Sequence, residues 1–279
     1  MRLHCWGSRG SVPVSGNSTQ CYGGDTSCLE LRSSRDYLII IDAGTGLREL
    51  GIRLETAGSN VCHLLMTHYH WDHIMGFPFF KPLYSKDTVL HIIGPCLAGK
   101  TPISVFSSVM DNPLFPNQFE RLRAEINGYV LPEEAFTIDT VLVETLPLRH
   151  PGGGAGYRFT ENGKTLIFLT DNELGEGGSG GLDYTEFVHF CRDADCLIHD
   201  AEYTDEEYPA ARSWGHSAAG QAVHLAAEAG VKHLSLFHHH PERTDAQIDR
   251  LVDTCRNQLE KLSADIKCSA LAEGDRFVI

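Results

Sequence analysis

Four residues that could bind metal ions lie within one six-residue segment. They are His68, His70, Asp72 and His73, and they directly follow residues 61–67, an apolar stretch typical of a buried strand. Side chains two positions apart can project to the same side, so His68 and His70 can share one ion. The aspartate and the third histidine can then reach a second ion. Such ligands suit zinc, and also iron or manganese. The alternative, solvent-exposed loop histidines, is disfavoured by this density of ligands.

Stretches that predict strands alternate with stretches that predict helices. The predicted strands are residues 37–42, 61–67, 89–93, 141–148, 165–170, 196–199 and 233–237, and the predicted helices are 46–56, 217–229 and 244–262. This alternation predicts an α/β layered fold. No stretch resembles an interdomain linker, so we expect one domain over residues 1–279. We expect residues 95–132, the least regular segment, to be an insertion that shapes the pocket, and the glycine-rich residues 175–181 to form a mobile loop.

The spacing of the first motif matches a known signature. His68-x-His70-x-Asp72-His73 resembles the His-x-His-x-Asp-His pattern of the metallo-β-lactamase superfamily. The resemblance implies an αββα four-layer sandwich, with a cleft for two metal ions at one edge.

Later residues match the remaining ligand positions of that superfamily. His150 follows a predicted strand and matches the histidine that completes the ligands of the first ion. Asp171 matches the aspartate that bridges the two ions. His238 ends a predicted strand and matches the histidine of the second ion. The adjacent His239 and His240 are rivals for that position, and His238 is preferred because it directly ends the strand.

Three more residues have expected roles beside the ligands. The resemblance implies that Asp42 orients the metal loop, although a helix N-cap is an equal alternative. Residues 197–203 and 215–219 resemble tRNA 3′-processing ribonucleases and related phosphodiesterases, in which a histidine acts on the scissile phosphate and an acidic residue orients it. The matching residues here are His216 and Asp200. A histidine before a helix could protonate a leaving oxygen, or it could merely cap the helix.

Composition argues against a nucleic-acid substrate. The chain has 23 lysines and arginines against 37 acidic residues, a formal net charge of −14, and its sequence contains no basic cluster. Such a surface repels phosphate backbones. The tRNA enzymes carry a long arm between the third histidine and the bridging aspartate, whereas only twenty residues separate His150 from Asp171 here. We therefore expect a small phosphodiester substrate, such as a cyclic nucleotide, and no tight nucleic-acid binding.

Cysteine content and hydropathy indicate a compartment. The nine cysteines are an odd number without a Cys-x-x-Cys pair, unlike a disulfide framework. No apolar run approaches the roughly 18–20 residues that cross a bilayer, and the first residues lack the apolar stretch of a signal peptide. We expect a cytoplasmic protein without membrane contact. The sequence leaves open whether it forms a homodimer.

The expected function is hydrolysis with two divalent metal ions, zinc foremost. The resemblance implies that a metal-bound hydroxide attacks a phosphodiester, with Asp72, His216 and Asp200 as the residues that act in catalysis. One alternative keeps the fold and the metals but attacks a carbon centre, as lactonases, thioesterases and β-lactamases do. Another is a metal-bearing redox or sensor protein without hydrolytic turnover. The related di-iron proteins replace histidines of the first motif, which this chain retains.

Overall fold

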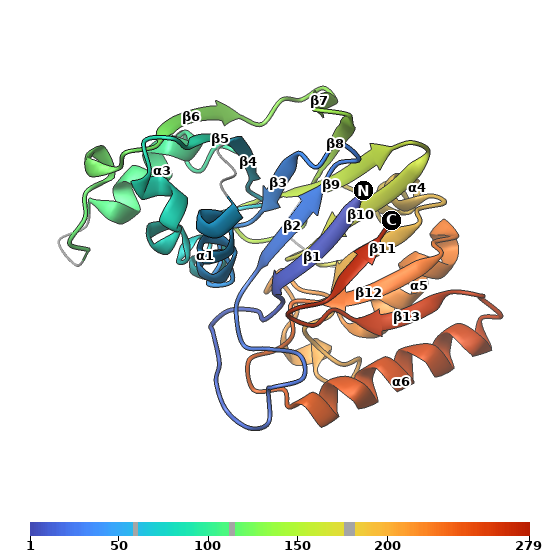
Figure 1. The fold of residues 1–279 in the computed structure, drawn as a ribbon. Helices are drawn as coiled ribbons and strands as arrows, with labels where there is room; N and C mark the ends of the chain where they lie inside the picture. The colour runs from blue at the N-terminus through green and yellow to red at the C-terminus, as the bar shows by residue number, and fades with distance from the viewer. Residues whose placement is uncertain (58–60, 112–114, 176–181) are drawn as a thin grey trace.

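Two seven-stranded sheets pack face to face in the computed structural model, which describes residues 1–57, 61–111, 115–175 and 182–279 (Figure 1). The first sheet has the order β14-β1-β2-β3-β4-β5-β6, and the second has the order β13-β12-β11-β10-β9-β8-β7. The strands of the first sheet are β1 (Arg2–Gly7), β2 (Cys28–Arg32), β3 (Leu38–Ile41), β4 (Val61–Leu65), β5 (Val89–Gly94), β6 (Glu125–Val130) and β14 (Arg276–Val278). Those of the second are β7 (Phe136–Ile138), β8 (Val141–Pro147), β9 (Ala155–Glu161), β10 (Lys164–Leu169), β11 (Cys196–Asp200), β12 (His233–Phe237) and β13 (Lys267–Ala270).

Helices cover the outer faces of both sheets (Figure 1). On the first sheet lie α1 (Leu47–Ala57) and α3 (Pro102–Met110), and on the second lie α4 (Tyr184–Cys191), α5 (Ala219–Ala229) and α6 (Asp245–Lys261). The short helix α2 (Trp71–Ile74) follows β4, and the 3-10 turns are η1 (Phe77–Phe79), η2 (Lys81–Tyr84), η3 (Phe119–Arg121) and η4 (Tyr208–Ala210). The predicted αββα sandwich is confirmed.

Alternating side chains along β3 explain the layers. Ile39 and Ile41 pack between the two sheets, whereas Leu38 and Ile40 pack outward against α1 and α3. A strand buried on both faces reads as a continuous apolar run, which is why its position was evident from the sequence.

The layered arrangement places the site at one edge. β3 and β4 run parallel in the first sheet, as do β10, β11 and β12 in the second, so their carboxyl ends meet at the same side of the molecule. Asp42, Asp171 and His238 follow three of these ends with positive φ angles of 62°, 51° and 59°. Left-handed backbone is uncommon outside glycine, although aspartate and histidine tolerate it better than most residues. The sharp turn there aims each side chain toward the gap between the sheets.

Residues 95–132 differ from the expectation of an irregular insertion. They contain helix α3 and strand β6, which extends the first sheet. The predicted glycine-rich loop, apart from Gly175, lies outside the described residues. The single domain over residues 1–279 stays a prediction. In the described part of the chain, no helix is both long and apolar enough to cross a bilayer; the cytoplasmic location also stays a prediction.

Candidate metal centre

The predicted ligands come together in two groups that share one aspartate. The first group holds His68, His70, His150 and Asp171, and the second holds Asp72, His73, His238 and Asp171. Within each group the ligand atoms lie within 4.8 Å of one another. All of these side chains are buried except that of His70, which is exposed.

Asp171 presents one carboxylate oxygen to each group. Its Oδ2 lies 3.6 Å from Nε2 of His68 and 3.8 Å from Nε2 of His150. Its Oδ1 lies 3.2 Å from Nε2 of His73 and 3.4 Å from Nε2 of His238. Zinc–nitrogen bonds of about 2.0–2.1 Å in a tetrahedral site set neighbouring ligand atoms about 3.3 Å apart. The separations therefore suit an ion on each side of this carboxylate.

Hydrogen bonds aim the imidazole rings. The Nδ1 partners are Thr67 Oγ1 for His68 (3.1 Å), Asp42 Oδ2 for His73 (2.8 Å), the Gly215 carbonyl for His150 (3.0 Å) and Glu202 Oε2 for His238 (3.0 Å). Each contact leaves Nε2 for the centre, as outer partners do in known metal sites. His70 is the exception, because it presents Nδ1, which lies 2.9 Å from Nε2 of His150.

Two buried imidazole nitrogens indicate whether the centre is suited to metal ions. Nε2 of His68 and Nε2 of His73 have no hydrogen-bond partner among the described residues. Burial alone would lower the pKa of His73, but the carboxylates of Asp171 and Asp72 raise it well above its usual range. Nε2 of His73 thus lies between the carboxylates of Asp72 and Asp171 without forming a hydrogen bond, and Nε2 of His68 lies 3.6 Å from the other oxygen of Asp171. Because buried polar atoms are nearly always satisfied, this donor set fits divalent cations.

Asp42 anchors the segment that carries the first motif. It accepts hydrogen bonds from the backbone amide of Thr67 at 2.8 Å and from Ser27 Oγ at 3.0 Å, besides its contact with His73. Its side chain thus connects the ends of β3 and β4.

His216 lies beside both ligand groups and pairs with Asp200. Its Nδ1 is 2.7 Å from Asp200 Oδ2, and its ring stacks on that of His238 with a centroid separation of 4.8 Å. Burial alone would lower the pKa of His216, but the carboxylates of Asp200 and Asp171 raise it to about 9. His216 also belongs to a third potential ligand group with Asp171, Asp200 and His238. Because Nδ1 bonds Asp200, Nε2 is the ring nitrogen of His216 that is not engaged by this carboxylate.

Comparison with known proteins identifies the family. The model of the beta-lactamase superfamily domain matches residues 37–239, which include every predicted ligand. The chain belongs to the beta-lactamase superfamily. It is 25% identical over 270 aligned residues to a ribonuclease Z of Thermoplasma volcanium, covering 81% of this chain and 84% of that protein.

Two solved structures share the fold of this superfamily member. The metallo-beta-lactamase fold protein YhfI from Bacillus subtilis superimposes with a TM-score of 0.72 at 18% identity, over 99% of this chain and 98% of that one. A diphosphatase from the PhnP family gives a TM-score of 0.70 at 17% identity, over 100% and 97%. The predicted superfamily is confirmed, and the chain is a metal-dependent hydrolase of this fold.

Sequence reasoning missed two acidic residues of this hydrolase. Glu202 is buried and holds His238. Glu173, also buried, accepts hydrogen bonds from Tyr208 Oη and from the amide of Gly215, so it anchors the loop that precedes His216. Each lies two positions after an aspartate that the sequence did single out. Side chains at that spacing face the same way along a strand end, a signal that could have identified Glu202.

The N-terminal loop reaches the metal centre. The backbone amide of Ser11 donates to Asp72 Oδ2 at 2.8 Å, and Arg9, fully buried, binds the carbonyls of Gly23, His240 and Arg243. These contacts hold the loop against the segment that follows His238.

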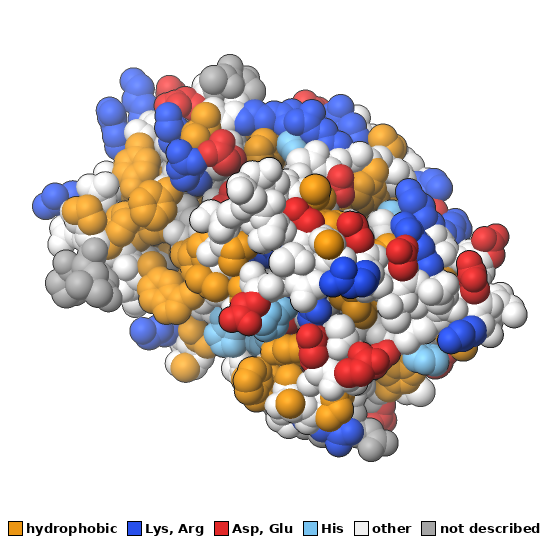
Figure 2. Space-filling model, turned by 90° about the horizontal axis from the view of Figure 1, so that it is seen from below, with side chains coloured by type: hydrophobic (Ala, Val, Ile, Leu, Met, Phe, Trp, Pro, Cys, Tyr) orange, Lys and Arg blue, Asp and Glu red, His pale blue; other side chains and the backbone are white. Residues whose placement is uncertain are grey.

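Two cavities flank His70 at the mouth of the centre. One, of about 490 Å³, is lined by His216, Tyr203, Trp214 and His240 among others, and the other, of about 220 Å³, is lined by Tyr69, Pro95–Leu97 and Gly152–Gly154 with His68 and His70. His240 therefore faces the larger cavity, while His239 is buried and bonds the Leu271 carbonyl at 2.9 Å. Neither belongs to a ligand group of the described residues. Figure 2 shows histidine side chains that reach the surface beside a broad hydrophobic area.

Proposed function

We propose that this hydrolase is a binuclear phosphodiesterase for small phosphodiesters, and that His216 protonates the leaving oxygen. The observation that carries the proposal is the pair formed by His216 and Asp200 beside the two ligand groups. A leaving alkoxide needs a proton, and a histidine with Nδ1 bonded to a carboxylate can deliver one from Nε2.

We assign seven residues to the metal ions. His68, His70 and His150 would hold the first ion, and Asp72, His73 and His238 would hold the second, with Asp171 common to both ligand groups. When bound, the ions neutralise phosphoryl oxygens and lower the pKa of a coordinated water toward 7. We propose zinc, because histidine and aspartate in four-membered sets suit it, with manganese or iron as alternatives.

We place the two sides of the substrate in the two cavities. Because His216 lines the larger cavity, the leaving alcohol is proposed to lie there, against Tyr203 and Trp214. The retained group then lies in the smaller cavity, beside Gly152–Gly154. Asp200 keeps the imidazole of His216 in one orientation, since its other oxygen accepts hydrogen bonds from the amides of Glu202 and Ser217.

The lining of the cavities supports a small substrate over tRNA. Neither cavity has a lysine or arginine among its lining residues. Polynucleotide binding depends on neutralising several phosphates. The twenty residues between His150 and Asp171 are largely taken up by β9, a turn and β10, so they form no extended arm. Because several relatives are ribonuclease Z, precursor tRNA is the rival substrate.

A substrate panel tests the proposal. The purified protein, supplied with zinc or manganese, is assayed on cyclic nucleotides, dinucleotides and aryl phosphodiesters, on aryl esters and lactones, and on a precursor tRNA. We expect kcat/KM to be highest for a small phosphodiester. Higher kcat/KM on esters or lactones would assign the site to carbon-centred hydrolysis, and efficient cleavage of the tRNA 3′ trailer would overturn the small-substrate assignment.

A further inference from the structure

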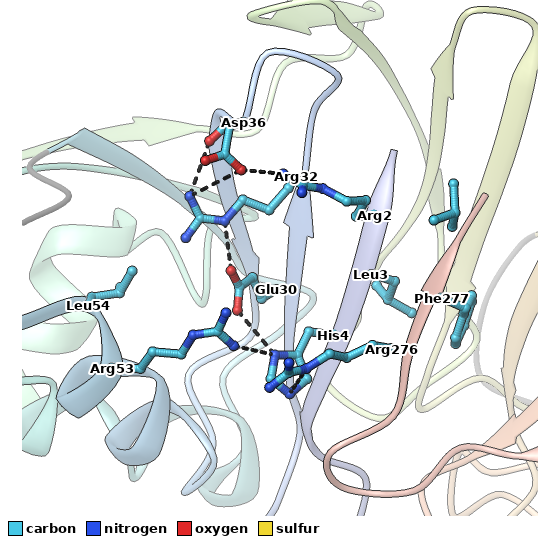
Figure 3. Close-up of a pocket in the computed structure, with 11 residues that line it drawn as sticks. Arg2, Leu3, His4, Glu30, Arg32, Asp36, Arg53, Leu54, Arg276 and Phe277 are labelled. Carbon is cyan, nitrogen blue, oxygen red and sulfur yellow. Dashed lines mark hydrogen bonds and ion pairs between the residues drawn. The ribbon is translucent and has the colours of Figure 1, made fainter. Parts of the chain in front are cut away.

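A third cavity, of about 600 Å³, lies on the outer face of the first sheet (Figure 3). It runs between α1 and the strands β14, β1 and β2. The lining residues are Arg2, Leu3, His4, Glu30, Arg32, Asp36, Arg53, Leu54, Arg276, Phe277 and Val278. We call it the arginine groove. It shares no residue with the metal centre.

The groove lies away from the catalytic edge. Asp36 precedes β3, whereas Asp42 follows it, so these two aspartates mark opposite ends of one strand. The side chains of His4 and Glu30 project from the middle of β1 and of β2, on the face opposite the core between the sheets. A ligand in this groove would not touch the metal ligands.

The fold concentrates positive charge that the sequence disperses. Four arginines reach the groove from four elements, namely Arg2 from β1, Arg32 from β2, Arg53 from α1 and Arg276 from β14. Two carboxylates, Glu30 and Asp36, face them. With His4 counted as neutral, four positive and two negative groups leave a net charge of +2 in a chain whose formal net charge is −14. The sequence had indicated no basic cluster, because these arginines are far apart along the chain.

Two of the four arginines, Arg2 and Arg32, form ion pairs with the carboxylates. Glu30 Oε1 lies 2.7 Å from Arg32 Nε, and Glu30 Oε2 accepts from Trp6 Nε1 at 2.9 Å. Asp36 pairs with Arg2 and also with Arg32. Both acids are therefore shared among several donors.

The other two arginines, Arg53 and Arg276, both lie beside the imidazole of His4. Arg53 Nη1 lies 3.1 Å from His4 Nδ1, and Arg276 Nε lies 3.4 Å from His4 Nε2 (Figure 3). His4 Nδ1 also lies 3.5 Å from Glu30 Oε2 and donates to it, so a neutral His4 accepts a hydrogen bond only through Nε2, on the side of Arg276. No carboxylate of the described residues forms an ion pair with Arg276. The guanidinium groups of Arg53 and Arg276 thus lie on the two sides of the His4 ring and concentrate positive charge at this point of the groove.

We propose that the arginine groove binds a small phosphorylated molecule, with its phosphate between Arg53 and Arg276. A phosphate monoester has three terminal oxygens and a charge of about −2, so it can pair with both guanidinium groups at once, which a single carboxylate does less well. The volume lies within the roughly 300–1,000 Å³ typical of small-molecule sites. Leu54 and Val278 provide apolar lining for the rest of the molecule. The ligand class is a phosphate monoester of about mononucleotide size.

Calorimetric titration with adenosine monophosphate tests the groove in the metal-loaded protein. Adenosine monophosphate can also bind at the metal centre, so its binding to the wild-type protein is compared with its binding to variants of the groove. In Arg53→Ala/Arg276→Ala, the affinity of one binding component should fall by at least about tenfold, as expected for the loss of two charge-assisted contacts. Phosphodiesterase turnover should stay at the wild-type level. Arg192→Ala/Arg250→Ala removes two exposed arginines elsewhere and should bind as the wild type does.

Several results would overturn the proposal. One is that the wild type shows a single binding component, which disappears when the metal is removed. Another is that the control variant loses as much affinity as the groove variant. A third is that an RNA oligonucleotide binds in the groove and the mononucleotide does not. Adenosine, which lacks phosphate, should not bind the groove. If the double variant melts at a lower temperature than the wild type, Arg276→Gln alone gives the same test, because the Arg276 side chain is exposed.

Discussion

Nδ1 of His216 lies 2.7 Å from the carboxylate of Asp200, and the same carboxylate oxygen accepts the backbone amide of Asp171 at 3.1 Å. One buried acid therefore fixes both the proposed proton donor and the backbone of the proposed bridging ligand. Their relative placement does not depend on a bound substrate.

Replacing His216 separates catalysis from metal binding. His216→Ala should retain both ions, since neither assigned ligand set includes it, and should reduce turnover by about 10²–10⁴, the usual contribution of positioned acid–base catalysis. The loss should shrink for nitrophenolate, a leaving group that needs little protonation. Kinetics on a poor and a good leaving group, with metal content measured on the same samples, check this.

Asp200→Asn should show a weaker form of the same pattern. An equal loss on both substrates together with lost metal would instead mean that His216 is a ligand. Unchanged turnover on both substrates would contradict the proposed role of His216. The alternative that His216 caps the helix is wrong, because the N-cap of α5 is Ala218.

Glu202 should increase the affinity for the second metal ion by orienting His238. Glu202→Gln replaces the carboxylate that holds His238 Nδ1 at 3.0 Å, so the affinity for the second ion should fall by about 10–100-fold. Competition with a chelating dye measures that affinity. Glu206→Gln is the matched control, because Glu206 is exposed four positions away. Equal affinities in the two variants would contradict the assigned role.

Glu30 makes stability depend on pH. Burial alone would raise its pKa, but hydrogen bonds from His4, Arg32 and Trp6 lower it to about 2, against an ordinary value of 4.5. The stabilisation is therefore complete above about pH 4.5 and is lost as the pH falls toward 2. Glu30→Gln should reduce the free energy of unfolding at pH 7 by about 1–3 kcal/mol, and this difference should narrow below pH 4.5.

Urea unfolding across this pH range checks that prediction, with the exposed Glu134→Gln as control. A difference between Glu30→Gln and the wild type that stays constant from pH 7 to pH 3 would contradict the low pKa.

The sequence predicted the strands buried on both faces and the residues that follow them. β3, β4 and β12 lie within one or two residues of the predicted limits, because continuous apolar runs end abruptly at polar residues. The structure brings His238, and not His239, into a ligand group, as its position directly after the strand had indicated. Short local patterns were sufficient for these features.

Contacts between segments that are distant in the chain could not be predicted from the sequence. β1 and β14 pair although they lie at opposite ends of the chain, and only that pairing brings Arg276 beside His4. The contact of Ser11 with Asp72 likewise depends on how a loop folds back. No local spacing encodes either contact, so neither the arginine groove nor the N-terminal loop could be predicted.

Metal titration of the apoprotein tests the central claim most directly. Protein freed of metal by a chelator is supplied with zinc or manganese in increments, and bound metal and turnover of an aryl phosphodiester are measured on the same samples. Two ligand groups that share Asp171 predict that bound metal saturates at two ions per chain and that turnover reaches its maximum there. Full activity in metal-free protein, or maximal activity with saturation at one ion, would contradict the binuclear centre.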